Sequence, residues 1–459
     1  MNLLRYNRLF LPLLALFVMA VLFPDKSYAV PSFARQTGLN CTNCHTIWPE
    51  LTPMGRAFKL GGFTQSTAGT PYETLPPISV GAVISYTSAK QNGDGADLTN
   101  GITPFDNAGH KSTDKASIPQ EFNLFYGGRI YGNVGAFVVG TFDGVEKSVS
   151  LDMLDLRYAD STASIAGTPL VWGITVNNLP SIADIYMTTP VWKYPYEQST
   201  NALTPSVHTK IDGGLDTQVG GAGVYAKWND LVYAEFSLYR TTNNGVTRPF
   251  GAGAATNTVV KGAVPYWRVA IEKQCGQEHS LMLGTYGMVS DIYLSGATDG
   301  PADRFTDIGL DAQYQYIGPL HIVTAQVTWI HERQGLFATY DEGGSTNAAN
   351  KLSTFRASVN YVYRSPIGAL GATVAYFNTT GTSDDTMYNT GNQYTGSQTG
   401  SPNSDGFIFE VNYLPIKYIK IGAQYIAYDR FNGSRKDYDG LGTNASHNNT
   451  IYLYSRLMF

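Results

Sequence analysis

Two cysteines and a histidine, Cys41, Cys44 and His45, form the pattern Cys-x-x-Cys-His near the start of the chain. This pattern is the attachment signal of a c-type haem. Two thiols one helical turn apart can each form a thioether bond to the porphyrin, and the histidine that follows at once is placed to bind the iron. The sequence therefore predicts one covalent c-type haem, with Cys41 and Cys44 as attachment sites and His45 as an axial iron ligand.

Two other kinds of site also use a Cys-x-x-Cys pair. A redox disulfide of thioredoxin type normally lies near a βαβ unit, whereas only a short segment rich in proline, serine and glutamine separates this pair from the leader. A structural zinc site needs two further ligands, and the next histidine, His110, lies far beyond the usual spacing. Haem is therefore the favoured interpretation.

The motif lies in a predicted haem segment, residues 30–76, which is too short to bury a core by itself. Its apolar residues must cover the haem or pack on something larger. Met54 is a candidate second iron ligand, and packing against the porphyrin is an equally good alternative. Three cations are candidates to pair with haem propionates, or else are ordinary solvated side chains: Arg35, Arg56 and Lys59.

Residues 1–29 have the features of a signal peptide. Arg5 and Arg8 precede an apolar run, Leu9–Phe23, and small residues at Ser27 and Ala29 suit a cleavage site. The run is shorter than the roughly 20 residues that a membrane helix needs, although a retained anchor is the alternative. Export agrees with a c-type haem. Because the haem uses the other two cysteines, Cys275 has no partner cysteine, and no disulfide framework is expected.

Residues 77–459 show apolar and polar residues in alternation, as β-strands with two different faces do. A soluble sandwich shows the same alternation. Alternating short and long connections, abundant aromatic residues and a terminal strand ending in Phe459 favour an outer-membrane barrel. About 16 strands are expected, centred near residues 83, 124, 138, 154, 172, 222, 235, 268, 284, 310, 326, 358, 373, 409, 423 and 454.

The predicted fold is thus all-β: a transmembrane antiparallel barrel whose lumen is plugged or capped by the small haem segment. A barrel of this size has a lumen too wide for its own side chains to fill. The strand phase predicts inward-facing polar residues of both signs, which suggests ion-paired walls, with a water-filled lumen as the alternative. These residues are Asp155, Arg157, Glu235, Arg268, Glu272, Asp311, Arg356, Glu410, Lys420 and Arg456.

The composition argues against several classes of protein. A net charge of −5 and an isoelectric point near 5.8 disfavour binding to nucleic acid. The chain contains no glycine-rich phosphate loop after a strand and no nucleophile elbow. Charged residues make up only 15% of the chain, which suits a barrel better than a soluble enzyme.

The haem segment resembles a known family. Residues 30–38, the Cys41–His45 motif and residues 49–60 are similar to fused outer-membrane monohaem c-type cytochrome–porins, best known as iron-oxidising outer-membrane cytochromes. The dense match covers residues 30–64, and beyond them the similarity is only architectural. It implies one haem in the barrel, electron entry from extracellular Fe(II) and delivery to a periplasmic c-type cytochrome. The resemblance implies that Cys41 and Cys44 are the attachment sites and His45 the axial ligand. The position of Met54 is aromatic in many relatives.

Three functions are consistent with these features. The first is an electron conduit in the outer membrane of a Gram-negative bacterium, with both termini periplasmic, the long loops extracellular and Fe(II) or another donor outside. Acidic loop residues are candidates to attract Fe²⁺: Asp291, Asp299, Asp384, Asp385 and Asp405. The second is a porin whose haem segment gates the channel or senses redox state. The third is a haem enzyme acting on peroxide or a small molecule.

Overall fold

The computed structural model describes residues 31–67, 76–89, 113–180, 184–189, 197–241, 258–392 and 394–459. The predicted signal peptide lies outside these residues. Within them the strands are β1 (Ile78–Ala89), β2 (Thr113–Tyr131), β3 (Val134–Asp143), β4 (Ser148–Ile165), β5 (Thr168–Asn177), β6 (Val219–Trp228), β7 (Val232–Thr241), β8 (Val264–Cys275), β9 (His279–Tyr293), β10 (Ala302–Ile317), β11 (His321–Gly335), β12 (Ala349–Ser365), β13 (Gly368–Gly381), β14 (Ser404–Ile416), β15 (Ile419–Arg430) and β16 (Thr450–Met458).

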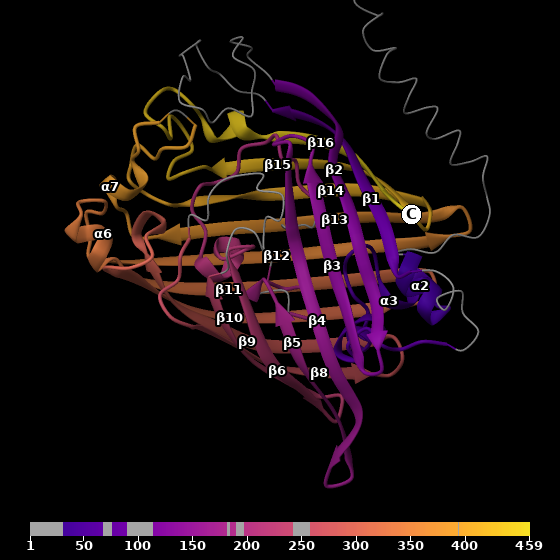
Figure 1. Ribbon diagram of the computed structural model, residues 1–459. Coiled ribbons are helices and arrows are strands. Elements are labelled where there is room, and N and C mark those ends of the chain that lie inside the picture. Colours follow the sequence, from indigo (N-terminus) through magenta and orange to yellow (C-terminus); the bar gives the residue numbers. More distant parts are fainter. Residues whose placement is uncertain are drawn as a thin grey trace, which may run out of the picture.

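The described strands form one closed antiparallel barrel, in which each strand pairs with its sequence neighbours and β1 pairs with β16 (Figure 1). The prediction of a barrel of about 16 strands is therefore confirmed, and every predicted centre lies within a strand. Closure leaves no unpaired strand edge along the wall. Among the described residues, no helix is both long and apolar enough to cross a bilayer.

The outer face of the barrel carries rows of exposed apolar side chains. Val359, Val374, Phe409, Tyr425 and Ile451 lie opposite one another on the five neighbouring strands β12 to β16, and each is at least 41% exposed. Other large apolar side chains are exposed on the remaining strands. An outward apolar band around a closed barrel is typical of a protein that spans a membrane.

The inner face is polar and paired. The predicted inward-facing residues are buried, with Arg356 and Arg456 partly so. Their ion pairs include Arg157–Asp155, Arg268–Asp311 and Lys420–Glu410. The prediction of ion-paired lumen walls is therefore confirmed for the described residues. Such pairing is needed because a buried charge without a partner costs several kcal/mol.

The two ends of the barrel differ. One end carries the tight connections, such as residues 132–133 and 366–367, and the other carries long ones that hold the short helices α6 (Phe337–Asp341) and α7 (Asp385–Tyr388). In the described connections, one-turn helices also lie between strands: η3 (Lys210–Gly214), η4 (Leu294–Gly296) and η5 (Ala445–Asn448). The C-terminus lies at the end opposite α6 and α7 (Figure 1).

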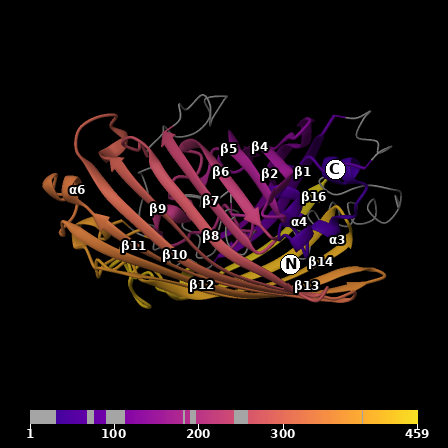
Figure 2. The ribbon, with the colours of Figure 1, turned by 90° about the horizontal axis from the view of Figure 1, so that it is seen from below.

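Among the described residues before the barrel there are three helices: α2 (Pro31–Thr37), α3 (Cys41–Cys44) and α4 (Pro53–Leu60). They lie at the end that holds the C-terminus (Figures 1 and 2). Helix α4 begins with Thr52, whose hydroxyl accepts a hydrogen bond from the Gly55 amide at 3.2 Å, followed by proline in the first turn.

The N-terminal segment is bound to strands on several sides of the ring. On β1, Ser79 Oγ accepts from the Ser32 amide at 3.2 Å, and on β6, Tyr225 donates to the Leu60 carbonyl at 2.7 Å. On β12, Arg364 donates to the Thr42 carbonyl at 3.1 Å. A segment that contacts such widely separated strands of a closed ring lies within its mouth.

The deepest of these contacts is a buried ion pair. Arg56 of α4 is fully buried and pairs with Glu272 of β8, while its guanidinium also donates to Gln313 at 3.1 Å and Gln315 at 2.8 Å on β10. Lys227 of β6 pairs with the same Glu272 at 2.7 Å. Two cations therefore share one carboxylate inside the barrel.

Removing that carboxylate should loosen α4. We expect Glu272→Ala to lower the free energy of opening of α4 by about 3–5 kcal/mol, because Arg56 keeps a buried charge without its anion. Hydrogen–deuterium exchange of the α4 amides in the detergent-folded protein measures this change.

The matched control is the exposed pair between Arg304 and Asp291, 2.8 Å apart. Asp291→Ala should change stability by only about 0–1 kcal/mol and leave α4 protected. Unchanged exchange of α4 in the Glu272 variant would show that the pair does not anchor the segment.

Candidate functional site

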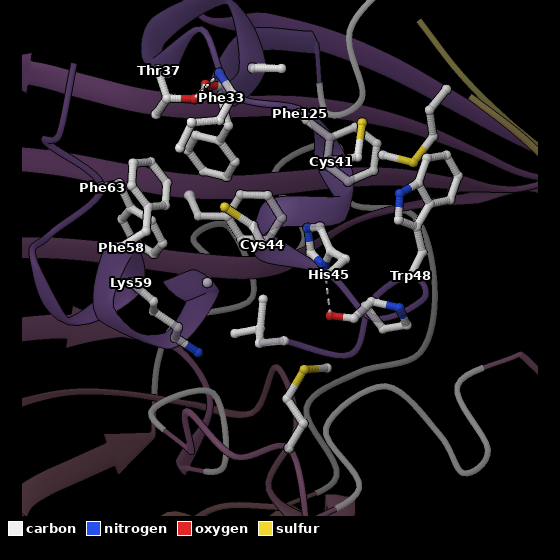
Figure 3. Close-up of a pocket in the computed structure, with 18 of the residues that line it drawn as sticks. Phe33, Thr37, Cys41, Cys44, His45, Trp48, Phe58, Lys59, Phe63 and Phe125 are labelled. Carbon is white, nitrogen blue, oxygen red and sulfur yellow. Dashed lines mark hydrogen bonds between the residues drawn. The ribbon is translucent and has the colours of Figure 1, made fainter. Parts of the chain in front are cut away.

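The segment and the barrel wall enclose one large cavity, with about 1330 Å³ of empty space when its open mouth is included. Aromatic side chains from α2, α4, β2 and β3 line it (Figure 3). They are Phe33, Phe58, Phe63, Phe125 and Phe137. Phe33 packs edge-on against Phe58, 5.0 Å between ring centroids, and stacks on Phe63 at 5.6 Å. The cavity is thus mainly apolar, as a site for a flat aromatic cofactor must be.

Cys41, Cys44 and His45 all line this cavity. In Figure 3 they lie between the phenylalanine cluster and Trp48. The single turn of α3 places the two thiols, and the His45 amide closes the turn by donating to the Cys41 carbonyl at 2.8 Å. The Thr52 amide donates to the Cys44 carbonyl at 3.0 Å, which ties the motif to the start of α4.

His45 has the protonation state of a metal ligand. Its Nδ1 lies 3.1 Å from the Pro49 carbonyl oxygen, which can only accept, so Nδ1 carries the proton and Nε2 keeps its lone pair. Burial lowers the pKa of His45, although backbone hydrogen bonds to Pro49 and Glu50 oppose this. A neutral imidazole oriented through its other nitrogen is the usual arrangement for binding iron.

Cys44 does not have the properties of a redox-active thiol. Burial, with a contribution from neighbouring Cys41, raises the pKa of Cys44 to about 11. A catalytic Cys-x-x-Cys pair needs a lowered thiol pKa, because the thiolate is the reactive form. The environment of Cys44 therefore disfavours a thioredoxin-like disulfide.

Of the three predicted propionate partners, only Lys59 reaches the cavity. Burial, followed by the charge of Arg157, lowers its pKa to about 8. Arg56 instead pairs with Glu272, and Arg35 donates to the Ile78 carbonyl at 2.8 Å. Both are corrections to the sequence-based prediction, since anions and carbonyls far along the chain bind these cations.

Arg456 of β16 also lines the cavity, paired with Glu197 at 2.7 Å. Its inward phase was visible in the sequence. Its position beside the motif was not, because the closure of β16 onto β1 sets it.

Met54 is a further correction. Its side chain is 39% exposed and is not among the residues that line the cavity. Three other methionines do line it: Met153 of β4, Met187 of the chain between β5 and β6, and Met458 of β16. Strand alternation alone gave no reason to single them out.

Most of the proposed acidic loop residues have structural partners. Asp291 and Asp405 do not lie in loops as predicted but near the ends of β9 and β14, where they pair with Arg304 and Arg430. Asp384 accepts hydrogen bonds from the Ser345 hydroxyl and the Thr346 amide, and despite burial these and further hydrogen bonds hold its pKa below the usual range. The exceptions are two exposed residues, Asp299 and Asp385.

The residues present fit a c-type haem. The cavity offers two thiols in one helical turn, a neutral imidazole with Nε2 available, aromatic walls and two cations, Lys59 and Arg456, of the kind that pair with carboxylates.

Gly55 holds α3 and α4 together by having no side chain. A Cβ at this position would lie 2.2 Å from the Cys44 carbonyl oxygen, which is backbone and cannot move aside easily. We expect Gly55→Ala to separate the helices at a cost of about 1–3 kcal/mol. In the haem-free chain, maleimide should then label Cys44 at least about fivefold faster.

Exposed Cys275 provides the internal reference for the labelling rate. Gly61→Ala is the control substitution, because its Cβ would meet nothing nearer than the Ala57 carbonyl oxygen at 3.3 Å. Equal labelling of Cys44 in the two variants would contradict the expected role of Gly55.

No protein-family model and no curated protein matches the chain. Three solved structures of outer-membrane proteins are similar. The channel DcaP of Acinetobacter baumannii is 13% identical, with a TM-score of 0.43, covering 83% of this chain and 96% of its own. The anion-selective porin from Comamonas acidovorans is 10% identical, with a TM-score of 0.43, and the match covers 83% of this chain and 99% of that porin. OmpT of Vibrio cholerae is 10% identical, with a TM-score of 0.40, and the match covers 83% of this chain and 97% of OmpT. At these scores the likeness supports no inference about this chain.

Proposed function

We propose that the protein is an electron conduit of the outer membrane. One c-type haem is attached to Cys41 and Cys44 and bound through iron by His45. It accepts electrons from an extracellular donor, Fe(II), and passes them to a periplasmic cytochrome. The observation that carries the proposal is that these three side chains line one apolar cavity in the mouth of a closed barrel. The apolar outer face supports the membrane location.

The haem supplies reversible one-electron chemistry at iron. The chain's own residues do the rest. Covalent attachment prevents loss of the cofactor, and the Pro49 carbonyl orients His45. The phenylalanine cluster keeps water from the ring faces, which favours the less charged, reduced state. Lys59 and Arg456, which line the cavity, would be the cations nearest to the haem propionates.

The position of the motif suits transfer on the short-turn side. Thr42 and Asn43 of α3 are exposed, and Lys417, in the turn after β14, donates to Asn40 at 2.5 Å. The motif therefore lies at the rim that holds both ends of the barrel, which in this proposal faces the periplasm. A soluble cytochrome can approach that rim.

The detergent-purified, oxidised protein should be reduced by Fe(II). Stopped-flow visible spectra should show the sharp reduced bands of a c-type haem, and the double variant Cys41→Ala/Cys44→Ala should fold as a barrel with neither haem nor bands. If dithionite reduces the haem and Fe(II) never does, the iron assignment fails. A planar-bilayer conductance that changes with haem redox state would instead support the gated porin.

Lys59 should make the reduction potential depend on pH. Its ammonium is present below a pKa of about 8 and lost above it. A cation in the cavity disfavours ferric iron, so the potential should fall as the pH rises through about 8, or somewhat higher because the propionates favour the ammonium.

Spectroelectrochemistry from pH 6 to pH 10 measures this dependence, a range of about two units around the Lys59 pKa. Lys59→Gln should have a lower potential without this step, and Lys59→Arg, charged throughout, should also lack the step. A step that persists in Lys59→Gln would assign the titration to another group.

A further inference from the structure

Met187 is buried but lies outside the apolar clusters that the described residues form. It lies in the chain between β5 and β6, is only 6% exposed and lines the same cavity as His45. A buried thioether on a cavity wall and outside the apolar clusters is available to bind a ligand.

The backbone around Met187 is fixed by one carboxylate. Asp184 accepts hydrogen bonds from the amides of Tyr186 at 2.9 Å, Thr188 at 3.0 Å and Thr189 at 2.9 Å. Arg268 of β8 lies 3.5 Å from the same carboxylate. The turn is therefore bonded on both sides of Met187 and anchored to the barrel wall.

The residue before Met187 is held equally firmly. The Tyr186 carbonyl accepts from Gln313 at 2.9 Å and Gln326 at 3.1 Å, on β10 and β11. Its ring lies between the guanidinium groups of Arg56, at 5.4 Å, and Arg268, at 5.3 Å.

Met187 itself has a φ of 56°, a left-handed conformation that is uncommon for a residue with a side chain. Such a conformation persists where the surroundings impose it. Here the hydrogen bonds of Asp184 and Tyr186 on either side provide that constraint.

The other methionines are less suitable. Met153 and Met458 pack in one cluster with Trp48 and Phe125, against Cys41, so their side chains already have apolar partners. Met54 is 39% exposed and does not line the cavity. Met187 is also the only one of the three cavity methionines that comes from a long connection rather than a strand.

We propose that Met187 is the second axial ligand of the haem iron, opposite His45. This rests on the haem site proposed above and names the residue that completes it. The chemistry agrees, because a neutral thioether binds haem iron and raises its reduction potential relative to histidine. The haem segment then supplies one ligand, and a turn bonded to the barrel wall supplies the other.

The test uses the full-length protein with its haem attached. Met187→Leu keeps the size of the side chain and removes the sulfur. We expect it to lose the weak far-red absorption band of methionine-bound ferric haem and to lower the reduction potential. Met187→His should restore a six-coordinate, low-spin spectrum at a potential below that of the wild type. Met54→Leu and Met153→Leu are the matched controls and should keep the band.

The outcomes separate the two proposals. Covalent haem is first measured by the alkaline pyridine spectrum, and folding by the heat-dependent mobility of the barrel. Absence of covalent haem from the wild type overturns both proposals. If haem is present and the band is missing from the wild type or survives in Met187→Leu, only the ligand assignment is wrong. If Met187→Leu fails to fold, the spectrum of Met187→His decides.

Discussion

A single buried carboxylate joins the three parts of this molecule. Glu272, on β8, pairs with Arg56 of the N-terminal segment and with Lys227 of the wall, and it accepts a hydrogen bond from the Tyr186 hydroxyl at 3.3 Å. Tyr186 precedes Met187, so the segment, the wall and the inner turn are bound to one anion. Burying that anion is favourable only because all of these partners are present together. The position of the segment relative to the turn depends on it.

Closure of the barrel makes this interior possible. The segment is too short to form a core of its own, and the ring supplies one on all sides. The charges that hold it lie where water is excluded, so each is matched by an opposite charge or a hydrogen-bond donor. The same N-terminal segment that this polar network holds also lines the apolar cavity. The same wall is polar inside and apolar outside because successive side chains of a strand point to opposite faces.

The strands could be predicted because their signal is local. In β11, Thr324, Gln326 and Thr328 are buried, whereas Val323 and Trp329 lie on the outer face. The same alternation of polar and apolar residues can be seen in the sequence of the strand. The Cys-x-x-Cys-His motif could be predicted for the same reason, because its residues lie close together in the sequence. The partners of Arg56 and Arg35 and the position of Arg456 could not be predicted, because they depend on residues brought together by closure of the ring. The same applies to Met187, whose environment comes from strands more than 80 residues away.

The position of α3 at the rim of the barrel has a consequence for maturation. Once the barrel has closed, Cys41 and Cys44 line a cavity bounded by β2, β3 and β16, and the segment is bound to five or more strands. Both thiols nevertheless stay partly exposed at the short-turn rim. If haem is attached there as proposed, the thiols can be reached from that mouth of the finished barrel, so attachment does not have to come before assembly of the strands.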